Sequence, residues 1–181
     1  MDLKLYNKLA EELLGDVRYE LGNGRIQSAI EDYRVRDSGL KKGAGANFKK
    51  IQKWLDDYNE KYMRPKGQAF RLRYYQILAL HFAETVLERQ REQQPGYADR
   101  RMLAYWMATG SGKTLVMHLN ILQYLDHISP FDELEIILTT PGVNLIEQHR
   151  RELEPFVAEL NRAHGYRINL TIETTQALLR K

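Results

Sequence analysis

Cysteine is absent from the 181 residues, which excludes disulfide bonds and thiolate metal sites and fits a reducing cytoplasm. Long apolar runs are absent as well, and none approaches the roughly 20 residues that span a bilayer. The first residues lack the basic start, apolar core and small-residue cleavage site of a secretory signal. We therefore expect a cytoplasmic globular protein of one or two domains that makes no membrane contact.

Neither sign of charge dominates the sequence. The 27 lysines and arginines exceed the 24 aspartates and glutamates by only three, a balance that permits polyanion binding without arguing for it. The five histidines are scattered without the spacing of metal ligands: His81, His118, His127, His149 and His164. Function must therefore be sought in local motifs.

One stretch has the pattern of a phosphate-binding loop. It reads Met107-Ala108-Thr109-Gly110-Ser111-Gly112-Lys113-Thr114. An apolar run at 102–107 suits a buried strand, and a run at 115–122 is compatible with a helix. A strand, a glycine loop and a helix in this order are the setting that the motif requires.

The residue types in this loop suit a triphosphate and Mg²⁺. Gly110 and Gly112 lack a Cβ, so the backbone can curl and direct consecutive N–H groups at a phosphate. The following helix adds about half a positive charge at its N-terminus. Lys113 can reach the β- and γ-phosphates, and the Thr114 hydroxyl can ligate Mg²⁺. The alternative is a glycine-rich turn with an incidental lysine, and Met107 stands where the strict pattern has glycine.

The chain is expected to consist of a helical region at 1–66 and an α/β domain at 67–181. In the first region, Asn47 is expected to cap a helix with one apolar stripe. The stripe consists of Phe48, Ile51, Trp54, Leu55, Tyr58 and Tyr62. A long helix from Phe70 to about Arg91 is expected to open the second domain.

Strands and helices then alternate, which predicts a parallel sheet of about three strands. The expected strands are 102–107, 134–140 and 167–173. A helix from about 142 to 163 is expected to kink or restart at Pro155. A short helix is expected at 175–179.

Two further stretches, together with the loop, resemble superfamily 2 helicases and translocases. Leu72-Arg73-Tyr74-Tyr75-Gln76 precedes the loop, and Thr139-Thr140-Pro141, followed by Leu145 and Gln148, comes after the second strand. The resemblance is to the ATPase subunits of type I and type III restriction systems in particular. Their loop is commonly Met-Ala-Thr-Gly-x-Gly-Lys-Thr, so Met107 fits that family.

The resemblance implies a partial RecA-like lobe that binds ATP and Mg²⁺. Gln76 would bind N6 and N7 of adenine, since a carboxamide offers a donor and an acceptor side by side. Arg73 and Tyr75 would belong to the same site. The triphosphate contacts would come from Ala108, Thr109, Gly110, Ser111, Gly112, Lys113 and Thr114, with Lys113 and Thr114 in the catalytic roles. The alternative for Gln76 is a helix glutamine that faces solvent.

The resemblance also implies contacts with DNA, more readily double-stranded. Thr140, Pro141 and Gln148 would face DNA phosphates, and such contacts position a strand without reading its sequence. Partners would include the methyltransferase and specificity subunits of a restriction complex.

The family often has proline at the position of Tyr74, so the long helix is expected to begin a turn earlier in this chain.

The resemblance covers residues 67–181 and is incomplete. No apolar strand ending in Asp-Glu follows the third strand, and that motif would hold Mg²⁺ and activate the attacking water. We therefore expect an N-terminal fragment of an ATP-driven DNA translocase or helicase of a restriction or phage-defence system, inactive in hydrolysis alone. The alternatives are another P-loop kinase or NTPase, and a helical adaptor with a vestigial loop.

Overall fold

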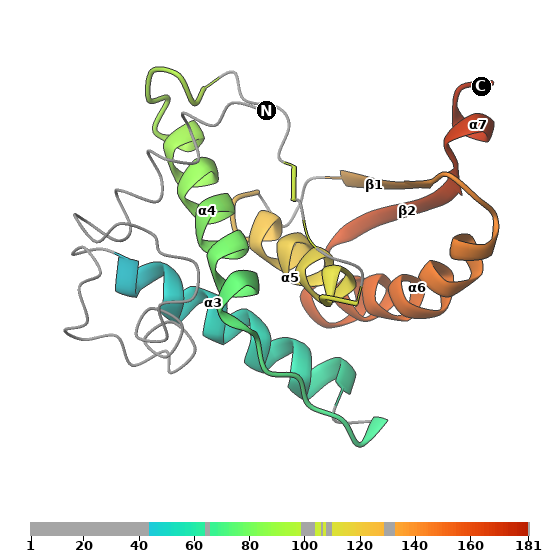
Figure 1. Ribbon diagram of the computed structural model, residues 1–181, viewed down its shortest axis with the longest axis horizontal. Coiled ribbons are helices and arrows are strands. Elements are labelled where there is room, and N and C mark those ends of the chain that lie inside the picture. The colour runs from blue at the N-terminus through green and yellow to red at the C-terminus, as the bar shows by residue number, and fades with distance from the viewer. Residues whose placement is uncertain are drawn as a thin grey trace. The chain divides into compact units, whose positions relative to one another are not determined.

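The chain divides into two compact units, residues 1–124 and 125–181, and each is described by itself. The computed structural model describes residues 44–63, 66–98, 104–105, 107, 110–128 and 133–180 (Figure 1). The boundary expected between residues 66 and 67 falls inside the first unit. None of the helices in the described ranges combines the length and the apolar character that crossing a bilayer demands.

The described part of the first unit is helical. Helix α3 (Ala44–Tyr58) continues directly into the π-helical turn η1 (Asn59–Met63). Helix α4 (Tyr74–Arg91) follows an extended segment, and α5 (Lys113–Leu125) follows the glycine loop. Hydrogen bonds from α3 reach both α4 and α5.

The apolar stripe expected on α3 is confirmed. Phe48, Ile51, Trp54, Leu55 and Tyr58 are buried, and Tyr62 is half-buried. The expected cap at Asn47 is wrong, because the helix begins at Ala44 and Asn47 lies buried inside it. Alanine is the strongest helix former, so Ala44 and Ala46 let the helix extend past the expected cap.

A buried polar network joins the three helices. Glu84 of α4 is fully buried and accepts hydrogen bonds from Lys50 of α3 at 2.7 Å and from Gln123 of α5 at 2.9 Å. Gln123 also donates to the carbonyl of Leu80 at 2.9 Å. A buried carboxylate is costly unless it is paired and hydrogen-bonded, so this network favours one arrangement of the helices.

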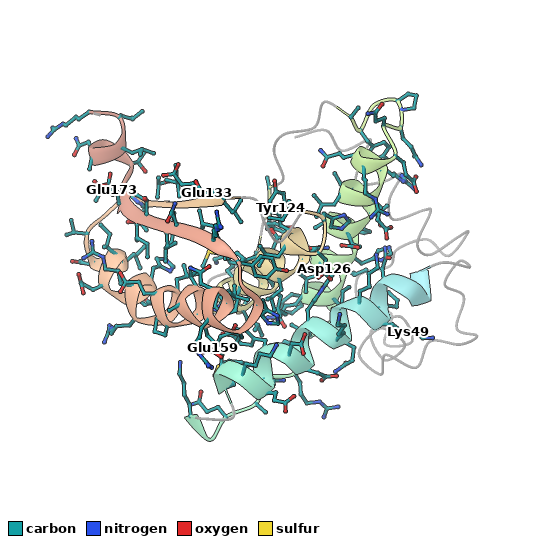
Figure 2. The ribbon with its side chains drawn as sticks, turned by 180° about the vertical axis from the view of Figure 1, so that it is seen from behind. Lys49, Tyr124, Asp126, Glu133, Glu159 and Glu173 are labelled. Carbon is teal, nitrogen blue, oxygen red and sulfur yellow. The ribbon has the colours of Figure 1, made fainter. Side chains whose placement is uncertain are left out.

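The lysine of this network differs from its neighbour in sequence. Lys49 is exposed (Figure 2), whereas Lys50 binds both Glu84 and Glu88 at 2.7 Å. Burial lowers the pKa of Lys50, but the hydrogen bonds and charges of the two carboxylates outweigh this effect and raise the pKa above its usual value. The ammonium group therefore stays charged and holds α3 to α4.

Helix α4 begins later than the sequence suggests. Its first residue is Tyr74, so the expected start at Phe70 is wrong. The expectation that the helix begins a turn earlier than in the family, because Tyr74 replaces the family's proline, is wrong as well. The Oε1 atom of Gln76 accepts a hydrogen bond from the backbone N–H of Arg73 at 2.8 Å, and Arg73 itself is extended. This side-chain cap ends the extended segment and starts the helix.

The end of α4 is where the sequence predicts it. The helix stops at Arg91, and Gln93 and Gly96 take φ values of 53° and 82°. Tyr97 then folds back and is buried, where the guanidinium of Arg89 lies 4.9 Å from the centre of its ring. The strand expected at 102–107 falls largely outside the described residues, and the described positions 104, 105 and 107 belong to no strand.

The second unit is a β–α–β arrangement followed by a short helix. It consists of β1 (Glu133–Thr140), α6 (Asn144–His164), β2 (Arg167–Thr174) and α7 (Thr175–Leu178). The strands pair in parallel, from Glu133 opposite Arg167 to Thr140 opposite Thr174. This confirms the second and third expected strands, their parallel order and the final short helix. The described sheet has two strands, not three.

Helix α6 covers one face of this sheet (Figure 1). The core of the unit consists of Leu153, Phe156, Val157 and Leu160 of α6 with Ile168 and Ile172 of β2. The alternate positions of both strands form a polar face that includes Glu133 and Glu173 (Figure 2). Ile137 of β1 belongs to this second face and is 47% exposed.

Pro155 lies inside α6 without dividing it. The sequence predicts a kink or a restart there, but one helix runs from Asn144 to His164, so the restart is wrong. Proline removes a hydrogen bond to the carbonyl four residues earlier, that of Arg151. Both Arg151 and Pro155 are exposed, so water can bind that carbonyl.

Candidate nucleotide-binding site

The start of α4 and the glycine loop meet through the side chain of Gln76. Its Nε2 donates to the carbonyl of Ser111 at 2.9 Å, while its Oε1 binds the N–H of Arg73. The hydroxyl of Tyr75 donates to the same Ser111 carbonyl at 3.3 Å. Gln76 is 4% exposed, so the solvent-facing alternative for this residue is excluded. Two motifs 35 residues apart in sequence are thus in direct contact.

Both loop glycines have a conformation that favours glycine. Gly110 and Gly112 take φ values of 75° and 77°, in the left-handed region that residues with a Cβ rarely adopt. At Gly112 there is a second requirement, because a Cβ would lie 2.5 Å from Nε2 of Gln76. The contact between Gln76 and the loop therefore needs glycine at 112.

The charged and hydroxyl groups of the loop are arranged around the start of α5. This helix begins at Lys113, so the N–H groups of its first turn lack intrahelical acceptors and can bind an anion. Nζ of Lys113 is exposed and donates to the Met107 carbonyl at 3.1 Å. The Ser111 hydroxyl is buried and has no hydrogen-bond partner among the described residues. A buried hydroxyl of this kind is satisfied when a ligand oxygen binds it.

These residues fit a bound nucleotide. The carboxamide of Gln76 still has one N–H and one oxygen lone pair beyond its two protein contacts, the set that an adenine edge requires. Magnesium would be held by the half-buried Thr114 hydroxyl with phosphate oxygens. Within the described ranges, no group of three or more histidine or acidic side chains is placed to hold a metal ion. Ala108 and Thr109 lie outside the described residues.

Two contacts beside this site have no clear signal in the sequence. Tyr58 of α3 shares a buried hydrogen bond with Nδ1 of His118 in α5, at 2.8 Å. The side chain of Asn59 binds the backbone of Phe70 through both its donor and its acceptor. A histidine among the apolar positions of α5 is a weak sign of such a contact, since a buried imidazole needs a partner.

The expected nucleic-acid residues lie in the second unit, around the carboxyl end of β1. Thr140 is buried and its hydroxyl donates to the carbonyl of Gly142 at 2.8 Å. Pro141 and Gln148 are exposed, and Nε2 of Gln148 lies 3.4 Å from the Glu152 carboxylate. Thr140 and Pro141 are thus brought to the start of α6, with the threonine hydroxyl engaged in its own turn.

Comparison with known families identifies the class of protein. The family model described as type III restriction enzyme, res subunit, matches residues 69–177. That match covers more than half of the chain, and the chain belongs to this family. No curated protein and no solved structure matches the chain.

Proposed function

We propose that the chain carries the ATP-binding part of a DNA helicase or translocase of a restriction or phage-defence system. The observation that carries the proposal is the hydrogen bond from Gln76 to the Ser111 carbonyl. It joins a residue suited to reading adenine to a loop suited to binding a triphosphate, so one nucleotide could engage both. Membership in the restriction subunit family supports the same function.

In this proposal each residue has a separate task. Gln76 binds the adenine edge, and Arg73 and Tyr75 lie on the same helix start beside it. The loop amides and Lys113 bind the phosphates and offset their charge, while Thr114 ligates Mg²⁺. Bound Mg²⁺ would add further charge neutralisation at the phosphates.

The proposal predicts nucleotide binding with little hydrolysis by this chain. Hydrolysis needs a carboxylate that orients or activates water, and none of the residues proposed here for the nucleotide site carries one. An ATPase assay with and without DNA tests this point. Rapid turnover would contradict it.

We further propose that DNA phosphates bind near the start of α6. Pro141 precedes the helix and Gln148 lies in its second turn, and both are exposed. No side chain caps the start of α6, and a helix N-terminus suits an anion. Thr140 would contribute through its place in the turn. Such contacts would be independent of DNA sequence. The partner subunits would be those of a restriction complex, a methyltransferase or specificity subunit, in the cytoplasm.

Nucleotide titrations test the main proposal. ATP and GTP, each with Mg²⁺, are titrated into the chain and into the variants Lys113→Ala and Gln76→Ala. We expect Lys113→Ala to weaken both nucleotides by about tenfold or more, since it removes a charge aimed at the phosphates. Gln76→Ala should weaken ATP more than GTP, because only adenine presents the matching edge. The exposed lysine of α3 supplies the control Lys49→Ala, which should change neither.

Two results would contradict the proposal. Equal losses for ATP and GTP in Gln76→Ala would refute the adenine assignment. A chain that binds DNA or protein partners without any response to ATP or to Lys113→Ala would instead be a helical adaptor with a vestigial loop.

A further inference from the structure

The junction between α3 and η1 presents two adjacent polar side chains. Tyr58 is the last residue of α3, and its hydroxyl lies 2.8 Å from Nδ1 of His118, with both residues buried. Asn59 is the first residue of η1. Its Nδ2 donates to the carbonyl of Phe70 at 2.9 Å, and its Oδ1 accepts from the N–H of Phe70 at 2.7 Å.

These two contacts lead to opposite ends of the nucleotide site. His118 lies four residues after Thr114 on α5, about one helical turn from the phosphate-binding end. Phe70 lies on the extended segment that ends at Arg73, whose N–H is bound by Gln76. The Tyr58 hydroxyl therefore contacts α5, one turn from its phosphate-binding end, whereas the Asn59 side chain contacts the backbone of the segment that leads to the adenine end. The Tyr58 ring also lies 6.4 Å from the Phe70 ring, so the hydroxyl is the part of Tyr58 that is specific to α5.

Polar contacts, more than apolar packing, hold the extended segment that precedes α4. Residues 66–71 are all exposed, and Phe70 itself is 40% exposed. Apart from the Phe70 ring, whose centroid lies 6.4 Å from that of Tyr58, little apolar packing restrains them before Leu72. The two hydrogen bonds from Asn59 engage both backbone groups of Phe70, as a neighbouring strand would. A two-point contact of this kind fixes the direction of the segment as well as its distance.

The local helix type supports a functional role for this junction. The helix changes from α to π at Asn59, the residue that makes the contact. Single π-helical turns at the ends of α-helices or within them are uncommon and occur frequently at functional sites. Here the change coincides with the step from the α5 contact to the Phe70 contact.

We propose that Tyr58 and Asn59 are positioning residues of the nucleotide site. They set the adenine-binding start of α4 against the phosphate-binding start of α5, through the Phe70 backbone and the His118 ring. The inference rests on the proposed function as an ATP-binding protein and extends it to the α3–η1 junction. Neither residue contacts the nucleotide itself.

The two residues should have different signatures. Without Asn59, the segment before α4 loses its anchor and Gln76 is held less well. The affinity for ATP should then fall. The affinity for GTP should fall less, because GTP makes less use of Gln76. Without the Tyr58 hydroxyl, α5 is the element affected, so both nucleotides should lose affinity together.

The test uses the whole 181-residue chain, with ATP and GTP titrated in the presence of Mg²⁺. We expect Asn59→Ala to lower the ratio of ATP affinity to GTP affinity by about fivefold, the worth of one net hydrogen bond. Tyr58→Phe should lower both affinities severalfold and leave the ratio unchanged. The variant Asn59→Asp keeps the acceptor for the Phe70 N–H but sets a carboxylate oxygen against the Phe70 carbonyl oxygen, so it should shift the ratio in the same direction as Asn59→Ala.

The second unit contains a matched control. Asn161 makes the same two-point contact with the backbone of Ile168, at 3.0 Å from Nδ2 and 2.9 Å to Oδ1. Asn161→Ala should therefore cost similar stability, measured by denaturant unfolding, without a change in the nucleotide ratio.

Each result decides between the positioning role and a structural one. If Asn59→Ala lowers ATP and GTP affinity by the same factor, or behaves like Asn161→Ala, the positioning role is overturned. If Asn59→Ala does not fold, the same comparison on Asn59→Asp decides, and an unchanged ratio overturns the role. A parent chain that binds neither nucleotide refutes the proposed function and the inference together, whereas selective binding with unaffected variants refutes the inference alone.

Discussion

Gln76 occupies the space next to Gly112, because a Cβ at Gly112 would lie 2.5 Å from Nε2 of Gln76. Gly110 has nearly the same φ value but no atom within 4 Å of such a Cβ. We therefore expect Gly110→Ala to cost about 1–2 kcal/mol in free energy of unfolding, from backbone strain alone. Gly112→Ala should cost about 0.5–1.5 kcal/mol more, because the Gln76 amide must move away and lose its hydrogen bond to the Ser111 carbonyl. Denaturant unfolding of both variants measures the difference.

The control for this prediction removes the clashing side chain. In a Gln76→Ala background, Gly112→Ala should cost no more than Gly110→Ala does. A difference that persists in that background would show that the contact with Gln76 is not its cause.

The two acidic partners of Lys50 should differ sharply in their contribution to stability. Glu84 is fully buried and also binds Gln123, whereas the side chain of Glu88 is 30% exposed. We expect Glu84→Ala to lower the free energy of unfolding by about 1–3 kcal/mol, since it leaves the buried amide of Gln123 without this acceptor, while Lys50 keeps Glu88. Glu88→Ala should cost less than about 1 kcal/mol, the usual worth of an exposed pair. Urea titrations compare the two, and similar losses would contradict the network described above.

His81 should make stability depend on pH in the acidic range. Burial lowers the pKa of His81 to about 4, from 6.5, with Glu84 opposing this shift and Arg89 adding to it. Its ring lies against Phe48 and Phe82, at centroid distances of 5.3 and 5.9 Å.

Between these two pH values the unfolded chain binds the extra proton, so acid favours unfolding. The contribution of His81 is fully present above pH 6.5 and is lost as the pH falls toward about 4. Its full size is about 3 kcal/mol. Urea unfolding over this range should show a shallower pH dependence for His81→Phe than for the parent chain. Equal slopes would contradict the burial of a neutral imidazole.

Replacing Pro155 should stabilise α6. The residue is exposed and lies inside the helix, so Pro155→Ala restores a backbone hydrogen bond and loses little packing. We expect the free energy of unfolding to rise by about 1–3 kcal/mol. The reverse change at the exposed Ala158, Ala158→Pro, should destabilise the protein. Thermal unfolding followed by circular dichroism measures both, and no gain from Pro155→Ala would mean that the helix bends to accommodate the proline.

Local sequence patterns predicted those parts of the fold that local physics decides. The alternation of apolar and polar residues in Arg167–Thr174 predicts a strand with one buried face, and the structure confirms it. The motif residues Gln76 and Ser111 were assigned to one site from resemblance, and they are in contact. Both predictions rest on short stretches of sequence, a strand pattern in the first case and two motifs in the second.

Contacts between distant residues could not be predicted in this way. The start of α4 depends on how the Gln76 side chain folds back, and a hydrophobic pattern does not report a side-chain cap. The buried state of Glu84 depends on Lys50 and Gln123, which come from two other helices. Pro155 lies at an exposed position of α6, and the helix continues through it, which the residue type alone does not predict.

The two hydrogen bonds between the Asn161 side chain and the Ile168 backbone have a consequence for how the two-stranded sheet assembles. Residues of β2 alternate between the two faces, so sliding the strand by one position would turn Ile168 and Ile172 outward and expose them. Asn161 sits in the last turns of α6 and holds Ile168 by both backbone groups before the strand proceeds. The side-chain amide of Asn161 thus favours the observed register of β2 over a register shifted by one residue.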